Sequence, residues 1–341
     1  MRAYWEFAPD AKAATERKRP IAQKAEDARQ KSGTERAIHA KGGKVMAMPF
    51  DQRPDLIWFD GKLIPTADCK ISVLTHGLHY ASTVFEGERA YGGVIFKGTE
   101  HSERLKRSAQ LMDFEIPFSV AEIDAAKRLV LERNNQAEAY VRAIAWRGSD
   151  QLGVSAQNNK IHLAVATWEW PSYFDPAQRL KGIRLDLAEY RRPDPRTAPA
   201  LAKAAGLYAI CTISKHRAER RGFADAMMLD WLGRVAECTG ANIFFIKDGK
   251  IHTPIADCFL AGITRATAIM LARRHNIEVI ERRIMPEELA DFSECFITGT
   301  AAEVTAVSQI ADWNFTPGRV TQQLMADYTA EVRPKGKAAA A

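Results

Sequence analysis

The sequence predicts a mixed fold of helices and strands (α+β, or mixed α/β) divided into two domains. At 341 residues the chain exceeds the length at which a single hydrophobic core stops growing. Its 46% hydrophobic and 26% charged residues are typical of a globular protein. Helical and strand patterns mix without a strict strand–helix–strand alternation, and an aromatic segment at residues 168–173 lies between two such groups.

The first group, residues 51–172, is expected to form a small α+β domain. Asp60-Gly61 and Gly92-Gly93 are typical of tight turns between antiparallel strands. Apolar residues at helical spacing and runs of strand-forming residues predict the rest. The expected elements are strands at 56–59 and 63–64, strands at 82–91 and 94–96, helices at 100–112 and 120–134, and strands at 139–146 and 161–168.

A connector at residues 173–180 is expected to lead to the larger second domain, residues 181–333. A Pro-rich loop at 191–199 and the turn Asp248-Gly249 punctuate this part of the chain. Residues 334–341 are expected to be a disordered tail. The expected elements are a strand at 183–187, a helix at 204–221, strands at 225–229 and 242–246, a helix at 264–274, strands at 295–298 and 304–310, and a helix ending near 332.

Charge is concentrated at the start of the chain. Residues 1–48 hold 11 Lys or Arg and 6 Asp or Glu, so most of the net charge of +6 lies there. The body is therefore close to neutral and lacks the basic surface that nucleic acid requires. We expect residues 1–50 to be a basic, disordered extension, and a binding protein that docks nucleic acid through this arm stays open as an alternative.

Two further observations bear on the compartment. The longest stretch without Asp, Glu, Lys or Arg, residues 71–85, is shorter than a membrane-spanning helix, so no membrane partner is expected. The five cysteines form no C-x-x-C pair, which indicates neither a zinc ribbon nor a disulfide framework. A cytoplasmic protein is expected.

Lys203 is the first candidate for chemistry. It is the only charged residue between Arg196 and Lys215 and is flanked by small apolar residues. Burial there is expected to lower the pKa of the lysine, which favours a nucleophilic amine able to form a Schiff base with an aldehyde or ketone. The alternative is an ordinary lysine that reaches solvent from a helix start.

Glu237 and two small-residue turns add to this pattern. Glu237 lies between strand patterns, where a buried carboxylate needs a partner such as a protonated ring nitrogen. Residues 261–264 open a predicted helix, whose free N–H groups favour an anion. Residues 298–302 form a hydroxyl-bearing turn after a strand. Together the two turns could hold one phosphate.

Seven motifs occur in a fixed order along the chain. They are Phe85-Glu86-Gly87 with Arg89 and Tyr91, Glu100-His101 with Arg104-Leu105, Tyr140-Val141-Arg142, Lys203-Ala204-Ala205-Gly206 with Tyr208, Glu237 with Asn242, Gly262-Ile263-Thr264-Arg265, and Gly299-Thr300-Ala301-Ala302-Glu303. In this order they resemble the motifs of the branched-chain amino acid aminotransferases, which are fold-type IV pyridoxal 5'-phosphate enzymes. The resemblance covers about residues 55–332 and implies a two-domain fold like that of D-amino acid aminotransferase, with the active site at the domain interface.

The resemblance implies a role for each residue at the cofactor. Residues 181–333 would form the domain that binds pyridoxal 5'-phosphate. Lys203 would carry the cofactor and act as general base and then acid, Glu237 would pair with its ring nitrogen, and Tyr208 would hydrogen-bond its ring oxygen. The phosphate would be held by Arg104, Ile263, Thr264 and Thr300.

The resemblance also implies a substrate site. Tyr140, Arg142 and the backbone at Ala301 would receive carboxylates, and Gly87 would lie beside them. An apolar pocket would be walled by Phe85, Tyr80, Trp170 and Tyr173, in part from a neighbouring subunit, which implies a homodimer or higher homo-oligomer. The implied reaction is transamination of leucine, isoleucine and valine with 2-oxoglutarate, giving branched 2-oxo acids and L-glutamate.

The chain departs from the family pattern at Glu88, where a hydrophobic residue is usual, and at Ala241, where a Glu is usual. Strand alternation predicts that Glu88 points away from the pocket. His76 and His79 lack further ligands nearby, so no metal site is expected, and Arg191-Arg192 is expected to be a solvated loop face. A D-amino acid or (R)-amine transaminase and a lyase like aminodeoxychorismate lyase stay open on the same fold.

Overall fold

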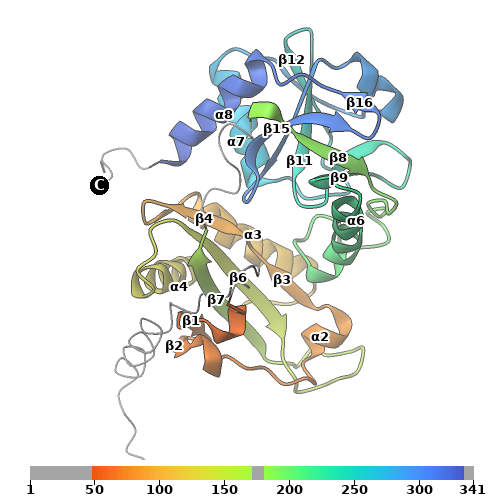
Figure 1. Cartoon of the computed structure of the whole chain (residues 1–341). Coiled ribbons are helices and arrows are strands. Elements are labelled where there is room, and N and C mark those ends of the chain that lie inside the picture. The colour runs from red at the N-terminus through yellow and green to blue at the C-terminus, as the bar shows by residue number, and fades with distance from the viewer. Residues whose placement is uncertain (1–47, 171–179, 334–341) are drawn as a thin grey trace, which may run out of the picture.

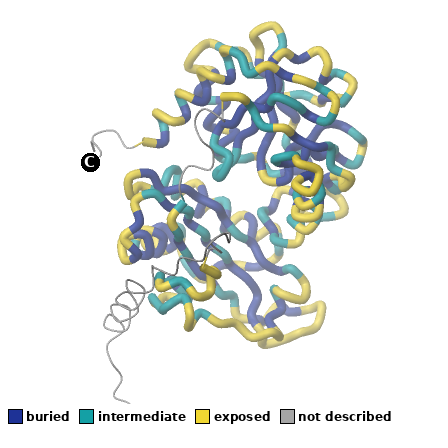
Figure 2. Tube along the Cα trace, viewed as in Figure 1, coloured by how far each residue is buried: buried dark blue, intermediate teal, exposed yellow. Residues whose placement is uncertain are grey.

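The computed structural model describes residues 48–170 and 180–333, which form two units, each built on its own β-sheet (Figure 1). Most of the predicted extension, most of the connector and the predicted tail lie outside the described residues, as does Tyr173. Buried residues run through the middle of both units, and exposed residues gather at their outer loops (Figure 2). No helix in the described ranges is long and apolar enough to cross a membrane.

The first unit contains a seven-stranded antiparallel sheet with the path β2-β1-β7-β6-β4-β5, and β3 also pairs with β6. The predicted hairpins at Asp60-Gly61 and Gly92-Gly93 are confirmed, and all four residues have positive φ, as such turns require. The strands are β1 (Leu56–Phe59), β2 (Lys62–Pro65), β3 (Thr83–Phe85), β4 (Glu88–Tyr91), β5 (Val94–Ile95), β6 (Ala139–Arg147) and β7 (Ile161–Glu169).

Two helices of this unit, α3 and α4, supply apolar side chains to a core shared with the sheet. This core joins Leu105 and Val130 of the helices to Val141 and Val165 of the strands. Ser119 caps α4 through a reciprocal pair of hydrogen bonds with Glu122, which fixes the helix start. The helical segments are η1 (Phe50–Gln52), η2 (Thr66–Asp68), α2 (His76–Tyr80), α3 (Gly98–Leu111) and α4 (Val120–Arg133).

The second unit contains a nine-stranded mixed sheet with the path β10-β9-β8-β15-β14-β11-β12-β13, and β16 pairs with β15. Strand β8 runs parallel to both β9 and β15, and β12 runs parallel to β13, whereas the other pairs are antiparallel. The strands are β8 (Ile183–Leu187), β9 (Asp225–Leu229), β10 (Val235–Cys238), β11 (Asn242–Lys247), β12 (Lys250–Pro254), β13 (Val279–Arg282), β14 (Glu294–Gly299), β15 (Glu303–Ile310) and β16 (Trp313–Asn314).

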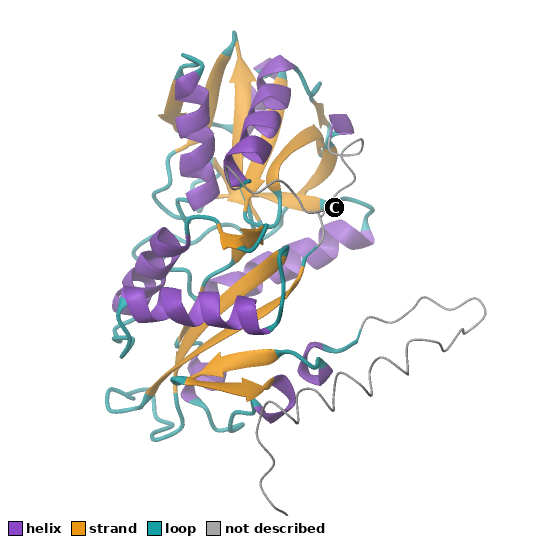
Figure 3. Ribbon diagram, turned by 90° about the vertical axis from the view of Figure 1, so that its left-hand side faces the viewer, coloured by secondary structure: helices purple, strands orange, loops and turns teal. Residues whose placement is uncertain are grey.

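The helices of the second unit pack on its sheet. Ala268 and Leu271 of α7 and Leu324 of α8 share one core with Phe244 and Phe296 of the strands, and Figure 3 shows this helix-and-strand packing from the side. The helix predicted from residue 204 begins as a 3₁₀ turn and becomes α-helical only at Ala209. The helical segments are η3 (Ala205–Tyr208), α6 (Ala209–Arg220), α7 (Ile263–Arg274), η4 (Pro286–Asp291) and α8 (Arg319–Val332).

The single strand predicted at 82–91 is wrong, because the chain breaks between β3 and β4 at Glu86 and Gly87. Long-range contacts explain the break. The Phe85 N–H donates to the Lys203 carbonyl at 3.1 Å, and the Glu86 N–H donates to the Ala143 carbonyl at 2.7 Å. The two units therefore meet at this break.

Candidate active site

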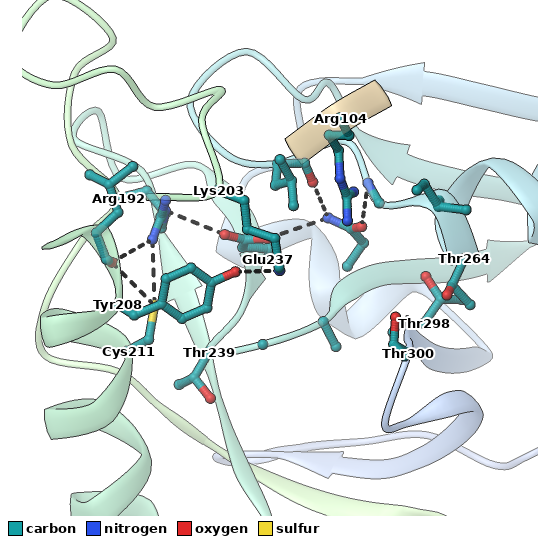
Figure 4. A pocket seen from close by; sticks show the side chains of 18 of the residues that line it. Arg104, Arg192, Lys203, Tyr208, Cys211, Glu237, Thr239, Thr264, Thr298 and Thr300 are labelled. Atoms are coloured by element: carbon teal, nitrogen blue, oxygen red, sulfur yellow. Dashed lines mark hydrogen bonds and ion pairs between the residues drawn. The ribbon is translucent and has the colours of Figure 1, made fainter. Parts of the chain in front are cut away.

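A cavity lies where the two units meet. Its walls come from α3 of the first unit and from η3, β10, β11, the start of α7 and the end of β14 in the second (Figure 4). All seven residues predicted at the cofactor line it: Arg104, Lys203, Tyr208, Glu237, Ile263, Thr264 and Thr300. The tertiary structure thus brings together residues that are up to 196 positions apart in the sequence.

Lys203 lies just before η3, and its backbone N–H donates to Ser108 Oγ of α3 at 3.0 Å. Its Nζ donates to Tyr208 Oη at 2.7 Å and lies 5.1 Å from the centre of the Phe85 ring. Burial lowers the pKa of Lys203, but the Tyr208 oxygen and the Glu86 carboxylate oppose it and leave the pKa above its ordinary value. The prediction of a lowered pKa is therefore wrong, because neutral neighbours in the sequence do not reveal charged neighbours in space.

Glu237 lies on β10 and is only 9% exposed. Burial raises the pKa of this carboxyl to about 7, although the Arg192 guanidinium opposes the rise. Arg192 Nε lies 3.3 Å from Glu237 Oε1, and Asn242 Nδ2 donates to Oε2 at 3.4 Å. The carboxyl group is thus near its point of charge change at neutral pH and could accept a hydrogen bond from a ring nitrogen.

The prediction that Arg191 and Arg192 form a solvated loop face is wrong for Arg192. Arg191 is exposed, but Arg192 is buried at 4% exposure. Its backbone bridges to Asp230, and its N–H donates to the Leu229 carbonyl at 2.7 Å. This pairing with the end of β9 turns the guanidinium inward, where it faces Glu237.

Arg104 marks the other end of the cavity. Glu86 accepts two hydrogen bonds from it, from Nε at 2.7 Å and from Nη2 at 2.8 Å, and His101 Nδ1 lies 2.7 Å from the same carboxylate. Burial alone would raise the pKa of Glu86, but Arg104 reverses this and holds it well below the ordinary value. The remaining Nη1 of Arg104 donates to the Ala261 carbonyl at 3.5 Å. Arg104 is thereby fixed beside the start of α7.

The first turn of α7 and the turn after β14 complete this end. Gly262 is the N-cap of α7, so the N–H groups that follow it lack partners within the helix. Thr264 and Thr300 both line the cavity, and Thr300 Oγ1 donates to the Gly87 carbonyl at 2.8 Å. A guanidinium, helix N–H groups and hydroxyl groups at one place suit a phosphate dianion.

The residues predicted at the substrate are also brought together in part. The Phe85 ring lies 4.9 Å from Tyr208 and 4.7 Å from the Arg142 guanidinium. Arg142 Nη2 donates to Tyr140 Oη at 3.5 Å. A Cβ on Gly87 would overlap that same hydroxyl, so the close approach requires glycine.

Two tryptophan side chains pack against Tyr140. Trp168 stacks on Tyr140 with ring centres 4.9 Å apart, and Trp170 lies 5.2 Å from Tyr140. Ala301 lines a second cavity, which shares Tyr208 with the first. The other predicted substrate residues that the structure describes line neither of these two cavities: Phe85, Gly87, Tyr140, Arg142, Trp170 and Tyr80. Tyr80 lies on α2, where it stacks on His76 and is 46% exposed.

Some residues at the cavity were not assigned a role from the sequence. Arg192, Cys211 and Thr239 line the cavity, but the sequence predicts a surface position for Arg192 and no role at this site for the other two. Glu86 and Asn242 belong to the seven motifs, but the resemblance assigns them no contact with the cofactor or the substrate. Two acids in an apolar stretch, Glu86 and Glu88, are a sequence signal for buried cationic partners. Glu88 points away from the cavity, as predicted, and pairs with Lys127 Nζ at 2.9 Å.

The comparisons with known proteins point to one family. The family model described as amino-transferase class IV matches residues 83–310. A probable branched-chain-amino-acid aminotransferase of Rickettsia felis is 41% identical over 281 residues, which are 81% of this chain and 96% of that protein. The branched-chain-amino-acid aminotransferase of Pseudomonas aeruginosa is 38% identical over 85% of this chain and 97% of that protein.

Solved structures agree with the sequence relatives. The branched-chain amino acid aminotransferase from Thermobaculum terrenum in its PLP form has a TM-score of 0.75 and 27% identity, and the match covers 82% of this chain and 94% of that chain. The branched-chain amino acid aminotransferase from Escherichia coli has a TM-score of 0.77 and 32% identity, over 84% and 97% of the two chains.

Fold and site together define a pyridoxal-phosphate enzyme of fold type IV. Within that class the chain belongs to the class IV aminotransferase family and is similar to its branched-chain members. The predicted fold class, family resemblance, enzymatic activity and cofactor are confirmed. The alternative of a binding protein without catalytic activity is therefore set aside for the body of the chain.

Proposed function

We propose that the chain transfers the amino group of leucine, isoleucine and valine to 2-oxoglutarate, giving branched 2-oxo acids and L-glutamate. One observation carries the chemistry: the amine of Lys203 lies in a cavity between Tyr208 and Glu237, with Arg104, Thr264 and Thr300 lining the same space. The substrate class is supported by the branched-chain enzymes that this chain resembles at 35–41% identity.

The donor groups of the cavity fit pyridoxal 5'-phosphate. Lys203 would hold its aldehyde carbon covalently, Tyr208 would hydrogen-bond the ring oxygen, and Glu237 would accept from the ring nitrogen. The phosphate would be held by Arg104, by the N–H groups at Ile263 and Thr264, by the Thr264 hydroxyl and by Thr300, which would turn its hydroxyl from the Gly87 carbonyl to the phosphate. When bound, the cofactor supplies a ring that accepts the electron pair released at the substrate α-carbon.

The protein's own residues would move the protons. Lys203 Nζ, held 2.7 Å from Tyr208 Oη, is the proposed base that removes the substrate α-proton and returns it as an acid. The Tyr208 oxygen and the Glu86 carboxylate keep a proton on the free amine, because they raise its pKa against the effect of burial. The amine must therefore lose that proton before it can attack a carbonyl.

The substrate would lie against the first unit. Tyr140, Arg142 and the backbone at Ala301 would receive its carboxylate, and Gly87 leaves room for the Tyr140 hydroxyl. Phe85 and Trp170, with Tyr80 and Tyr173, would form an apolar wall for a branched side chain. The same site must also accept glutamate, because both half-reactions use it.

A donor panel tests this function. Purified protein loaded with pyridoxal 5'-phosphate should be yellow, and L-leucine should bleach the colour while 2-oxoglutarate restores it. Borohydride reduction should fix the cofactor on the peptide that contains Lys203, and Lys203→Ala should abolish the adduct. Bleaching by D-amino acids or (R)-amines alone, or release of pyruvate without an amino acceptor, would contradict the branched-chain assignment in favour of the other two activities.

We further propose that two copies of the chain form a homodimer through the surface around α2. Several large apolar side chains are exposed there, and the loop carrying Val154 lies beside them, because His76 Nε2 hydrogen-bonds the Gly153 carbonyl at 3.0 Å. A patch of this kind on one surface favours a protein partner. It consists of Ile71, Val73, Leu74, Leu78, Tyr80, Leu152 and Val154.

We propose the cytoplasm as the working compartment. All five cysteines are free thiols, and four of them are buried. A reducing compartment keeps such thiols unpaired. Fractionation of cells that express the full chain, followed by immunodetection, tests this placement.

A further inference from the structure

This inference rests on the proposed function, in which two separate elements bind the two ends of the cofactor. Glu237 on β10 would meet the ring nitrogen, and the start of α7 would meet the phosphate. The distance between these elements has to match a rigid molecule. Contacts of Asn242 reach both of them.

Asn242 is the first residue of β11 and is only 4% exposed. Its Nδ2 donates to the Leu260 carbonyl at 3.0 Å and to Glu237 Oε2 at 3.4 Å. Its Oδ1 accepts from the Gly262 N–H at 3.0 Å. Both ends of the amide are thus bonded to groups that line or border the cavity.

The fit on the Gly262 side is tight. A Cβ on Gly262 would overlap Asn242 Oδ1, so this residue must lack a side chain for the hydrogen bond to form. Gly262 is also the N-cap of α7, and the two residues that follow it, Ile263 and Thr264, line the cavity. Moving Gly262 therefore moves the phosphate end, whereas Glu237 on the other side of Asn242 belongs to the ring end.

We propose that Asn242 is a positioning residue that sets the spacing between the carboxylate at the ring end and the helix start at the phosphate end of the cofactor site. It acts through Gly262 on the phosphate and through Glu237 on the ring. A shorter side chain leaves the Gly262 N–H without its acceptor and lets the start of α7 shift. The phosphate then contributes less to binding.

Pyridoxal and pyridoxal 5'-phosphate, which differ only in the phosphate, measure this contribution. The quotient is the dissociation constant of pyridoxal divided by that of pyridoxal 5'-phosphate, each measured by tryptophan fluorescence of the full chain. It is compared between wild type, Asn242→Ala, Gly262→Ala and the double variant. We expect each single variant to lower the quotient about fivefold, because one hydrogen bond contributes about 1 kcal/mol. The double variant should be no worse than either single one, because the added Cβ occupies the space that the amide vacates.

Asn159→Ala is the matched control. Asn159 is also buried, and its Nδ2 donates to the carbonyls of Gly148 and Gln151 at 2.9 Å, away from the cavity. Its loss should lower the melting temperature of the cofactor-free protein and leave the quotient unchanged. An unchanged quotient in both single variants, or fully additive losses in the double variant, would overturn this inference alone. Wild-type protein that binds both compounds equally would overturn the proposed phosphate site as well.

Discussion

Glu237 shows how burial controls a single residue at this site. Its pKa is about 7 in the folded protein because burial disfavours the charged form, compared with 4.5 for an ordinary glutamate. Between these values the folded protein holds a proton that the unfolded chain has released. Glu237 therefore contributes most to the stability of the cofactor-free protein below about pH 4.5. This contribution declines as the pH rises and is lost above about pH 7.

This shift predicts a pH dependence that one substitution removes. The unfolding free energy of cofactor-free wild type should fall between about pH 5 and about pH 8 by up to roughly 3 kcal/mol more than that of Glu237→Gln. Urea titrations of both proteins at the two pH values measure the difference. Glu88, whose burial raises its pKa to about 8, titrates in both proteins and cancels in the comparison. Parallel pH profiles would contradict the prediction.

Gly87 predicts a second effect at the residue scale. In Gly87→Ala the new Cβ overlaps the Tyr140 hydroxyl, so the phenol must move away from Arg142. We expect KM for L-leucine to rise about tenfold or more, while the affinity for pyridoxal 5'-phosphate changes less than twofold, since about 1.4 kcal/mol of lost contact is a factor of ten. Steady-state kinetics and cofactor titration measure the two quantities.

Gly93→Ala gives a control for that variant, because a Cβ on Gly93 meets no atom within 4 Å. The substitution should cost some stability, because Gly93 has a positive φ. The residue lies in the β4–β5 turn and not beside Tyr140. The KM of this variant should stay at the wild-type value. A Gly87→Ala enzyme with a normal KM would show that Tyr140 does not contact the substrate carboxylate.

At the scale of elements, the break between β3 and β4 organises the site. Successive residues there point to opposite sides: Phe85 approaches Lys203 and Tyr208, whereas Glu86 turns toward α3. Helix α3 then presents Arg104 to the cavity and Ser108 to the backbone of Lys203. A straight strand would form more sheet hydrogen bonds but would place neither group.

The buried contact between this break and α3 predicts a loss of stability. In Glu86→Gln, Arg104 and His101 lose the carboxylate that accepts from them inside the protein. We expect the unfolding free energy to fall by roughly 3 kcal/mol, as for other buried pairs that lose one partner. Denaturant unfolding of the cofactor-free protein measures it.

An exposed ion pair provides the comparison. Arg196 is 86% exposed and pairs with Asp194 at 2.6 Å. Arg196→Gln should leave the unfolding free energy close to the wild-type value, because water screens such pairs. Equal losses in the two variants would mean that burial does not strengthen the Glu86 contact.

At the scale of the whole molecule, the proposed dimer predicts coupling between assembly and activity. Val154 is 84% exposed in the patch around α2. Val154→Asp should place a charge in the interface and dissociate the dimer, with little loss of stability in the single chain. Activity should fall with assembly, because the apolar wall would then lack the part proposed to come from the second copy.

Sedimentation velocity and specific activity at matched concentrations test this coupling. Val94→Asp is the control, since Val94 is 49% exposed but lies on β5 at the edge of the sheet. It should remain a dimer with normal activity. A wild-type protein that sediments as a monomer and is fully active would contradict the proposed assembly.

Several turns and helices, and the chemistry of the main groups, could be predicted from the sequence alone, whereas the break in the strand at 82–91 could not. Turn residues at Asp60-Gly61 and Gly92-Gly93 act locally through their φ angles, and periodicity places α3 and α4, so both could be predicted from short stretches. The seven ordered motifs likewise identified the family and the cofactor. The seven residues predicted at the cofactor all line one cavity, although their individual roles remain proposals.

The contacts between charged groups depend on the tertiary structure and could not be predicted from the sequence. Arg192 is turned inward by pairing with the end of β9. The raised pKa of Lys203 comes from Tyr208 and Glu86, and Glu86 lies in the first unit whereas Lys203 lies in the second. The break in the 82–91 strand depends on contacts with Lys203 and Ala143. A local pattern reports the preferences of a segment, whereas pairing, burial and electrostatics depend on which distant segments the fold places beside it.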